Sequence, residues 1–169
     1  MIIAPETEKD FPQIYLFIKK AFETAEVADG KEQDFTNALR QSKAYIPELA
    51  LALKEKNKII GFIMLTKFYI NTPDGKKETL LLAPLCIDIA YRNKGLGQKL
   101  MAESFKKAKE LGFKSVLLVG NPDYYSRAGF KESSLFSIKN TDGIPDKFIL
   151  VKELETNALE GVSGTVSFH

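Results

Sequence analysis

The segment that decides the fold reads Leu85-Cys86-Ile87-Asp88-Ile89-Ala90-Tyr91-Arg92-Asn93-Lys94-Gly95-Leu96-Gly97-Gln98-Lys99-Leu100. An apolar run ends here, a turn with two glycines follows, and an amphipathic helix is expected from about Gln98. Backbone N–H groups at a helix start have no partner within the helix, and the helix dipole adds positive potential there. Gly95 and Gly97 carry no Cβ atom that would hold a ligand away from these groups. The segment therefore predicts a binding site for phosphate or pyrophosphate.

The glycine pattern is short, so its spacing needs to be compared with other phosphate-binding motifs. An [Arg/Gln]-x-x-Gly-x-[Gly/Ala] match arises by chance in roughly one chain in six of this length if Gly makes up about 7% of residues. An ordinary glycine turn before a helix is the alternative. A Walker loop requires Gly-Lys-Ser/Thr after four residues, and a dinucleotide fingerprint requires a third glycine that the chain lacks after Gly97. Arg92 and Lys94 are expected to add positive charge at the rim of the site.

The rest of the chain predicts a mixed α/β (α+β) fold in the order β-α-α-β-β-β-α-β-α-β. The second helix is expected to turn Phe35, Ala38 and Leu39 inward. Three strands joined by short turns form an antiparallel meander, and a βαβ crossover follows it. The result is a mostly antiparallel twisted sheet flanked by helices, in one domain over residues 1–169. The expected strands are 2–3, 49–53, 59–70, 79–89, 115–119 and 148–154, and the expected helices are 7–22, 33–40, 98–111 and 122–127, with 161–166 as a strand or an extended arm.

Composition narrows the class of protein. The chain has 169 residues, 44% of them hydrophobic and 27% charged, which is the balance of a soluble globular protein. A net charge of +2 gives no reason to expect nucleic acid or an anionic membrane as a partner. No apolar run approaches the roughly 20 residues of a membrane helix, and the first residues do not form a signal peptide. One cysteine and one histidine argue against a metal site and against a Ser-His-Asp or Cys-His hydrolase. The expected location is cytoplasmic.

A second motif lies about 30 residues after the glycine turn. It reads Leu118-Val119-Gly120-Asn121-Pro122-Asp123-Tyr124-Tyr125-Ser126-Arg127-Ala128-Gly129-Phe130. The two segments together resemble the GNAT superfamily of N-acetyltransferases, which has a coenzyme A pyrophosphate loop written Gln/Arg-x-x-Gly-x-Gly/Ala and a later Tyr-x-x-x-Gly-Phe. The wording of the second motif and of the tail at 161–166 is similar to that of small bacterial YhbS-like acetyltransferases. Ile89 departs from the proline that many members carry before the loop.

The resemblance implies an enzyme that moves an acetyl group from acetyl-CoA directly to a primary amine, without a metal. It implies that Tyr125 is the general acid that protonates the departing thiolate, with Tyr124 as a rival. Backbone groups at the end of the third meander strand are implied to pair with the pantetheine arm, and an N–H there to polarise the thioester. Asn121 and Tyr124 are implied to contact the coenzyme near its reactive end. The implied coenzyme-binding residues are Ile87, Asp88, Ile89, Arg92, Asn93, Lys94, Gly95, Leu96, Gly97, Gln98, Asn121 and Tyr124.

Several questions stay open at the level of sequence. The general base is Glu23, Glu26, Asp88 or a water chain, and no feature chooses among them. Cys86 is expected to be a small core residue rather than a nucleophile. The acceptor amine is not identified, although the resemblance implies that residues 23–33 and 140–147 select it. A non-catalytic acyl-CoA-binding module and a binder of other phosphate ligands are the alternatives, and the protein is expected to be a monomer or a homodimer.

Overall fold

The computed structural model describes residues 1–25 and 28–169, which form two compact units. The first unit contains residues 1–66 and 82–107, and the second contains residues 67–81 and 108–169. Strands β3 (Lys58–Thr72) and β4 (Gly75–Ile87) and helix α3 (Leu96–Glu110) each begin in one unit and end in the other. The expected order of strands and helices is confirmed, with two additional short strands between α4 (Pro122–Tyr125) and the last predicted strand.

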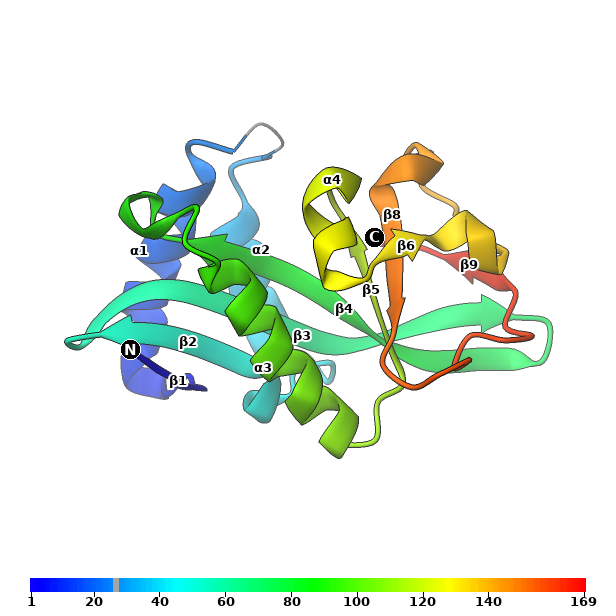
Figure 1. Cartoon of the computed structure of the whole chain (residues 1–169), viewed down its shortest axis with the longest axis horizontal. Helices are drawn as coiled ribbons and strands as arrows, with labels where there is room; N and C mark the ends of the chain where they lie inside the picture. The colour runs from blue at the N-terminus through cyan, green and yellow to red at the C-terminus, as the bar shows by residue number, and fades with distance from the viewer. Residues whose placement is uncertain (26–27) are drawn as a thin grey trace. The chain divides into compact units, whose positions relative to one another are not determined.

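The first unit is a twisted antiparallel sheet with helices on both faces. Strand β1 (Ile2–Pro5) pairs antiparallel with β2 (Ala50–Glu55), β2 pairs antiparallel with β3, and β4 follows β3 in the strand order. Helices α1 (Phe11–Phe22) and α2 (Glu32–Arg40) cover one face, and the first turns of α3 cover the other, as Figure 1 shows. Alternate strand residues separate the two faces, because side chains in a strand point to opposite sides.

The core of the first unit lies between α1 and the sheet. Ile14 and Ile18 of α1 pack with Phe62 and Met64 of β3 and with Cys86 of β4, and all five are buried. Helix α1 is preceded by a capping box: Asp10 accepts hydrogen bonds from the Thr7 backbone N–H at 2.9 Å and from its hydroxyl at 3.1 Å. Burial of this apolar face holds the helix on the sheet.

Helix α2 buries a different face from the expected one. Phe35 is 42% exposed and Ala38 is exposed, whereas Gln33 and Thr36 are buried. Both polar side chains can be buried because their hydrogen bonds are satisfied locally, from the Thr36 hydroxyl to the Glu32 carbonyl at 2.9 Å and from the Gln33 amide to the Gly30 carbonyl at 2.9 Å. The prediction that Phe35 and Ala38 face inward is therefore wrong, while Leu39 is half-buried against the core.

The second unit continues the sheet with short strands. Strand β4 pairs in parallel with β5 (Ser115–Val119), and β5 pairs antiparallel with β8 (Ile149–Glu153). Strand β8 also pairs with β6 (Lys131–Glu132), which the sequence did not predict because two residues carry no periodic signal. Helix α4 (Pro122–Tyr125) follows β5 directly, and a 3-10 turn at Ser126–Ala128 continues it. This connection carries the second motif.

The tail forms a strand, which settles the choice between a strand and an extended arm. Strand β9 (Gly164–Val166) pairs in parallel with β7 (Ile138–Asn140). It also pairs antiparallel with β3, where Thr165 is opposite Asn71. Val166 is buried with Ile138 in the core of the second unit. Among the described residues, no helix is long and apolar enough to cross a membrane.

Candidate functional site

The backbone N–H groups that the sequence marks are free to bind a ligand. Helix α3 begins at Leu96, two residues earlier than expected. The first hydrogen bond of the helical pattern runs from the Lys99 N–H to the Gly95 carbonyl at 3.1 Å. In the part of the chain that the structure describes, the N–H groups of residues 94–98 have no hydrogen-bond partner. Five adjacent donors at a helix start, in the positive end of its dipole, form a site that favours an anion.

Gly95 provides the open space that such a site requires. Its φ is +76°, a conformation that residues with a Cβ atom rarely adopt, and a Cβ atom built there would meet no other atom within 4 Å. Asn93, two residues earlier, also has a left-handed backbone with φ of 63°. The two left-handed residues turn the chain sharply into α3, and the space beside Gly95 is open to a ligand.

The Gln98 side chain adds a donor in the same place. Its Nε2 atom is buried and makes no hydrogen bond within the described residues, although Gln98 as a whole is only half-buried. A buried donor without an acceptor is costly, so it indicates a partner that the protein chain does not supply. The donors of the loop backbone and of Gln98 therefore fit the phosphate oxygens of a ligand such as coenzyme A.

The strand before the loop ends earlier than the sequence predicts. Strand β4 stops at Ile87, and Ile89–Tyr91 form a 3-10 turn in which Ile89 is 62% exposed. Asp88 starts this turn, since its side chain accepts the Ala90 N–H at 2.9 Å, and its own N–H reaches the Ile60 carbonyl of β3 at 2.8 Å. Its carboxylate also lies 3.6 Å from the Lys58 ammonium group. Asp88 is thus a turn-forming residue.

The Arg92 side chain makes hydrogen bonds within the first unit. Its guanidinium group donates to the carbonyl of Ile87 at 3.0 Å, to the hydroxyl of Thr24 at 3.1 Å and to the carbonyl of Ala21 at 3.0 Å. Arg92 is expected to add positive charge at the rim, and its guanidinium group is held by these three acceptors of the first unit; its part in binding the coenzyme stays a prediction. Lys94 is exposed, with its ammonium group 5.5 Å from the ring centre of Tyr91.

Cys86 has the surroundings of a core residue. It is 7% exposed and packs with residues of α1, β2 and β3. Burial raises the pKa of its thiol, and the charge of Arg92 offsets only part of that rise. A thiol with a raised pKa is not present as the nucleophilic thiolate, so the expectation of a structural role is supported.

In the second unit, the turn after β5 fixes the two tyrosines. Asn121 caps α4 through its side-chain oxygen, which accepts the Asp123 N–H at 2.9 Å. The Tyr125 ring lies edge-on to Tyr124 at 4.9 Å and to Phe130 at 5.7 Å between ring centres. Burial raises the pKa of Tyr124, and Arg127 offsets this rise only in part. Tyr124 is therefore a weaker acid than an ordinary phenol.

Gly120 is a residue whose role the sequence reasoning missed. A Cβ atom built on it would lie 2.7 Å from Cε2 and 3.1 Å from Cδ2 of the Tyr125 ring. Contacts below 3.0 Å do not occur for real Cβ atoms. Only glycine therefore leaves room for the Tyr125 ring at its observed position beside the end of β5. The signal in the sequence was the position of Gly120 in the second motif, directly before Asn121-Pro122.

Comparison with known proteins identifies the family. The family model described as the acetyltransferase (GNAT) family matches residues 11–131. The chain belongs to the acetyltransferase (GNAT) family. The uncharacterized N-acetyltransferase YhbS of Escherichia coli strain K12 is 26% identical over 169 residues, which is 100% of this chain and 96% of that protein.

Solved structures with the same fold have coenzyme bound. The crystal structure of E. coli YhbS in complex with CoA matches with a TM-score of 0.87 and 25% identity, covering 99% of this chain and 89% of that one. A GNAT family acetyltransferase from Brucella melitensis in complex with acetyl-CoA matches with a TM-score of 0.80 and 23% identity, covering 99% and 95%. The second match shows the fold alone. The predicted mixed, mostly antiparallel GNAT fold is confirmed.

The acidic residues of this acetyltransferase do not single out a general base. Glu23 is exposed just after α1, and Glu26 lies outside the described residues. Asp142 of the late loop accepts the Ser167 hydroxyl at 3.0 Å and the Phe168 N–H at 2.7 Å, so it fastens the end of the chain. These hydrogen bonds hold the pKa of Asp142 below its usual range, and the bond from the Phe168 N–H has the largest effect. The base stays an open prediction.

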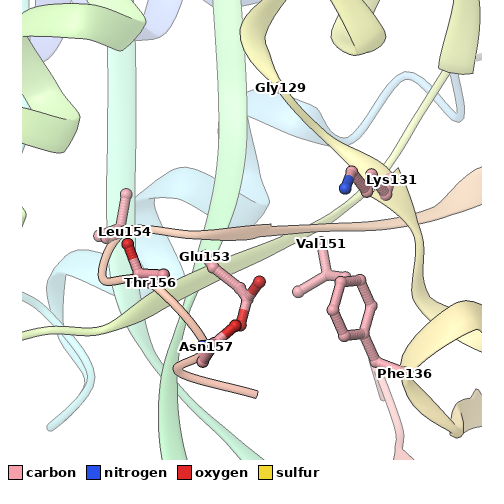
Figure 2. A pocket seen from close by; sticks show the side chains of 8 residues that line it. All are labelled: Gly129, Lys131, Phe136, Val151, Glu153, Leu154, Thr156 and Asn157. Carbon is pink, nitrogen blue, oxygen red and sulfur yellow. The ribbon is translucent and has the colours of Figure 1, made fainter. Parts of the chain in front are cut away.

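A separate hollow in the second unit contains none of the predicted site residues. Its volume is about 300 Å³. Figure 2 shows Glu153 and Asn157 on one side of it and Lys131, Val151 and Phe136 on the other. The predicted coenzyme-binding residues of the acetyltransferase lie elsewhere, at the start of α3 and after β5. The hollow therefore does not serve as evidence for the coenzyme site.

Proposed function

We propose that the protein transfers an acetyl group from acetyl-CoA to a primary amine. The observation that carries this proposal is the row of free N–H groups over residues 94–98, together with the open space at Gly95 and the unpaired Nε2 of Gln98. In a protein of the GNAT family this arrangement fits the pyrophosphate of coenzyme A. The structure of E. coli YhbS in complex with CoA supports the same ligand here.

The proposed reaction is a direct transfer. The amine nitrogen forms a bond to the thioester carbonyl carbon, the carbon–sulfur bond breaks, and the departing thiolate takes a proton. We propose that the Tyr125 hydroxyl donates that proton to the thiolate. The resulting phenolate is then reprotonated by the proton that the amine nitrogen releases. A free phenol and a free thiol have pKa values of about 10 and 8.5, so this transfer is mildly uphill unless the bound state lowers the phenol pKa. The raised pKa of Tyr124 disfavours it as the donor.

The remaining expectations stay predictions at this point. We propose that backbone groups of residues 86–89 pair with the pantetheine arm and that Asn121 and Tyr124 contact the coenzyme. Among the described residues, no cluster of His, Cys, Asp and Glu side chains is placed to hold a metal ion. We also propose a cytoplasmic location, one functional domain over residues 1–169, and a monomeric or homodimeric state.

The experiment is an acetyl-transfer assay that detects release of the CoA thiol. The purified protein is mixed with acetyl-CoA and with primary amines of different classes: polyamines, amino acids, aminoglycosides and lysine-containing peptides. We expect thiol release with at least one class. Tyr125→Phe should lower kcat by about 100-fold, the lower end of what general acid catalysis contributes, without changing acetyl-CoA affinity. Tyr124→Phe is the comparison variant: because Tyr124 is proposed to contact the coenzyme, its substitution should act on acetyl-CoA affinity and leave kcat at saturating acetyl-CoA close to that of the wild type.

One alternative has specific support, because no general base is evident. A non-catalytic acyl-CoA-binding module would bind acetyl-CoA but release no thiol with any amine class. That result would contradict the proposed enzyme activity and leave the proposed coenzyme site intact. Equal activity of Tyr125→Phe and the wild type would contradict the role of Tyr125 alone.

A further inference from the structure

The Arg92 guanidinium group joins two segments of the first unit that are about 70 residues apart in sequence. Arg92 is the first residue of the glycine motif, whereas Ala21 and Thr24 stand at and just after the end of α1. Its Nη2 donates to the Ala21 carbonyl at 3.0 Å and its Nη1 to the Thr24 hydroxyl at 3.1 Å. Its Nε donates to the Ile87 carbonyl at 3.0 Å, which anchors the group to the end of β4.

The end of α1 depends on these bonds. The last carbonyl groups of a helix have no partner within the helix. Here the Lys20 carbonyl accepts the Glu23 N–H at 3.3 Å and the Phe22 carbonyl accepts the Ala25 N–H at 3.2 Å. The Ala21 carbonyl accepts Arg92 and, at 3.3 Å, the Thr24 hydroxyl. Arg92 thus supplies the strongest bond at this end, from a cation placed where the helix dipole is negative.

Only arginine can make this set of contacts. The planar guanidinium group offers five donors in fixed directions, so one side chain reaches three acceptors on two segments, the end of β4 and the end of α1. A lysine ammonium group carries the same charge on a flexible stem and lacks this fixed geometry. The glutamine that the family motif also permits at this position carries no charge and has two donors.

We propose that Arg92 is a positioning residue that couples the coenzyme loop to the end of α1. When a ligand orders residues 92–98, the backbone of Arg92 is fixed and its guanidinium group holds Ala21 and Thr24 more firmly. By linkage, the same coupling must act in reverse, so that events at the end of α1 change affinity at the loop. The inference rests on the proposed function, because it requires coenzyme A to bind at the loop.

The test is hydrogen exchange followed by mass spectrometry, with and without coenzyme A. In the wild type, coenzyme A should slow exchange in a peptide covering residues 92–98 and also in one covering residues 17–25. In Arg92→Gln, coenzyme A should still protect the loop peptide, but its effect on residues 17–25 should vanish. Without ligand, residues 23–25 of this variant should exchange about tenfold faster, since a charged hydrogen bond is lost.

Two further variants separate coupling from other effects. Arg92→Lys keeps the charge and should restore only part of the coupling. Lys94→Gln removes an exposed cation of the loop and should weaken coenzyme A binding, measured by calorimetry, more than Arg92→Gln does, while leaving the coupling to residues 17–25 in place. These variants also show whether each protein remains folded, because their other peptides should exchange as in the wild type.

Three results would overturn the inference. Persistent coenzyme-dependent protection of residues 17–25 in Arg92→Gln would show that another contact carries the coupling. Loss of coenzyme A binding in Arg92→Gln but not in Lys94→Gln would make Arg92 a phosphate ligand. Failure of the wild type itself to bind coenzyme A would overturn the proposed function and the coupling together. This result is distinguishable from the first two because it is seen in the wild type, before any substitution is made.

Discussion

Removal of the Arg40 side chain should destabilise the protein strongly, because it leaves a buried carboxylate without its counter-charge. The Glu6 side chain is 0% exposed and the Arg40 side chain 6%. Arg40 donates to Glu6 through Nη2 at 2.7 Å and through Nε at 2.9 Å, a two-point contact. The Tyr45 hydroxyl donates to the same carboxylate at 2.7 Å. These contacts connect the end of α2 to the residue that follows β1.

The magnitude follows from what remains after Arg40→Ala. Glu6 keeps one side-chain donor, the Tyr45 hydroxyl. The contact of the guanidinium carbon of Arg40 with the Phe11 ring, 4.4 Å from the ring centre, is also lost. Breaking a buried ion pair by removing one partner typically costs about 3–5 kcal/mol. Burial, and then the hydrogen bond to Glu6, raise the pKa of Tyr45, so its hydroxyl keeps its proton at neutral pH and remains a donor to Glu6.

The assay is urea unfolding of the wild type, Arg40→Ala and a control followed by circular dichroism. Lys114→Ala is the control, since Lys114 and Glu155 form a 3.9 Å pair in which both side chains are more than half exposed. It should leave the free energy of unfolding unchanged within error. If Arg40→Ala were also within about 1 kcal/mol of the wild type at an unchanged urea slope, the reasoning on this buried pair would be refuted.

Three further substitutions test other parts of the account. Gly120→Ala must displace the Tyr125 ring, because a Cβ atom would lie 2.7 Å from Cε2; kcat should fall by up to about 100-fold at unchanged acetyl-CoA affinity, and an unaltered kcat would argue against Tyr125 as the proton donor. Burial alone would raise the pKa of Asp10, but hydrogen bonds from Lys54 and Thr7 outweigh it and lower the pKa. The stabilisation by the Asp10 carboxylate is therefore complete above its pKa in the unfolded state, about 4, and is lost as pH falls through its lower pKa in the folded state. The stability advantage of the wild type over Asp10→Asn should accordingly shrink below about pH 4 in acid titrations. An advantage that does not depend on pH would show that the charge is not its source. Cys86→Ala should retain acetyl transfer within about threefold, since burial raises the pKa of that thiol and disfavours the thiolate, whereas an acetylated Cys86 detected by mass spectrometry would point to a covalent intermediate.

The parts of the fold that local pattern controls could be predicted. The glycine turn, the apolar run before it and the helical spacing after it place β4, the loop and α3 within about four residues of their observed bounds, because each signal lies within one stretch of chain. Leu111 is an exception: it is the last apolar residue of the helix expected over 98–111, yet it is 47% exposed. The helix ends at Glu110, and Gly112 turns the chain with a φ of +92°, so Leu111 leaves the buried face.

The parts that depend on distant contacts could not be predicted. The Arg92 side chain binds residues about 70 positions earlier, and no local pattern distinguishes that arrangement from a free cation at a phosphate loop. The same holds for β7, whose three residues are strand-like only because β9 pairs with them near the end of the chain. For α2, the buried Gln33 and Thr36 reverse the expected polarity because their hydrogen bonds are satisfied within the segment.

The most direct test of the central claim is calorimetric titration of coenzyme A into the wild type, Gly95→Ala and Gly112→Ala. Both glycines have a positive φ and open space around an added Cβ atom, so the two substitutions introduce similar backbone strain. Gly95 adjoins the free N–H groups, and Gly112 follows the other end of α3. We predict micromolar binding by the wild type and by Gly112→Ala and at least a tenfold loss for Gly95→Ala. No binding by the wild type, or equal binding by all three, would contradict the account of the loop as the coenzyme site.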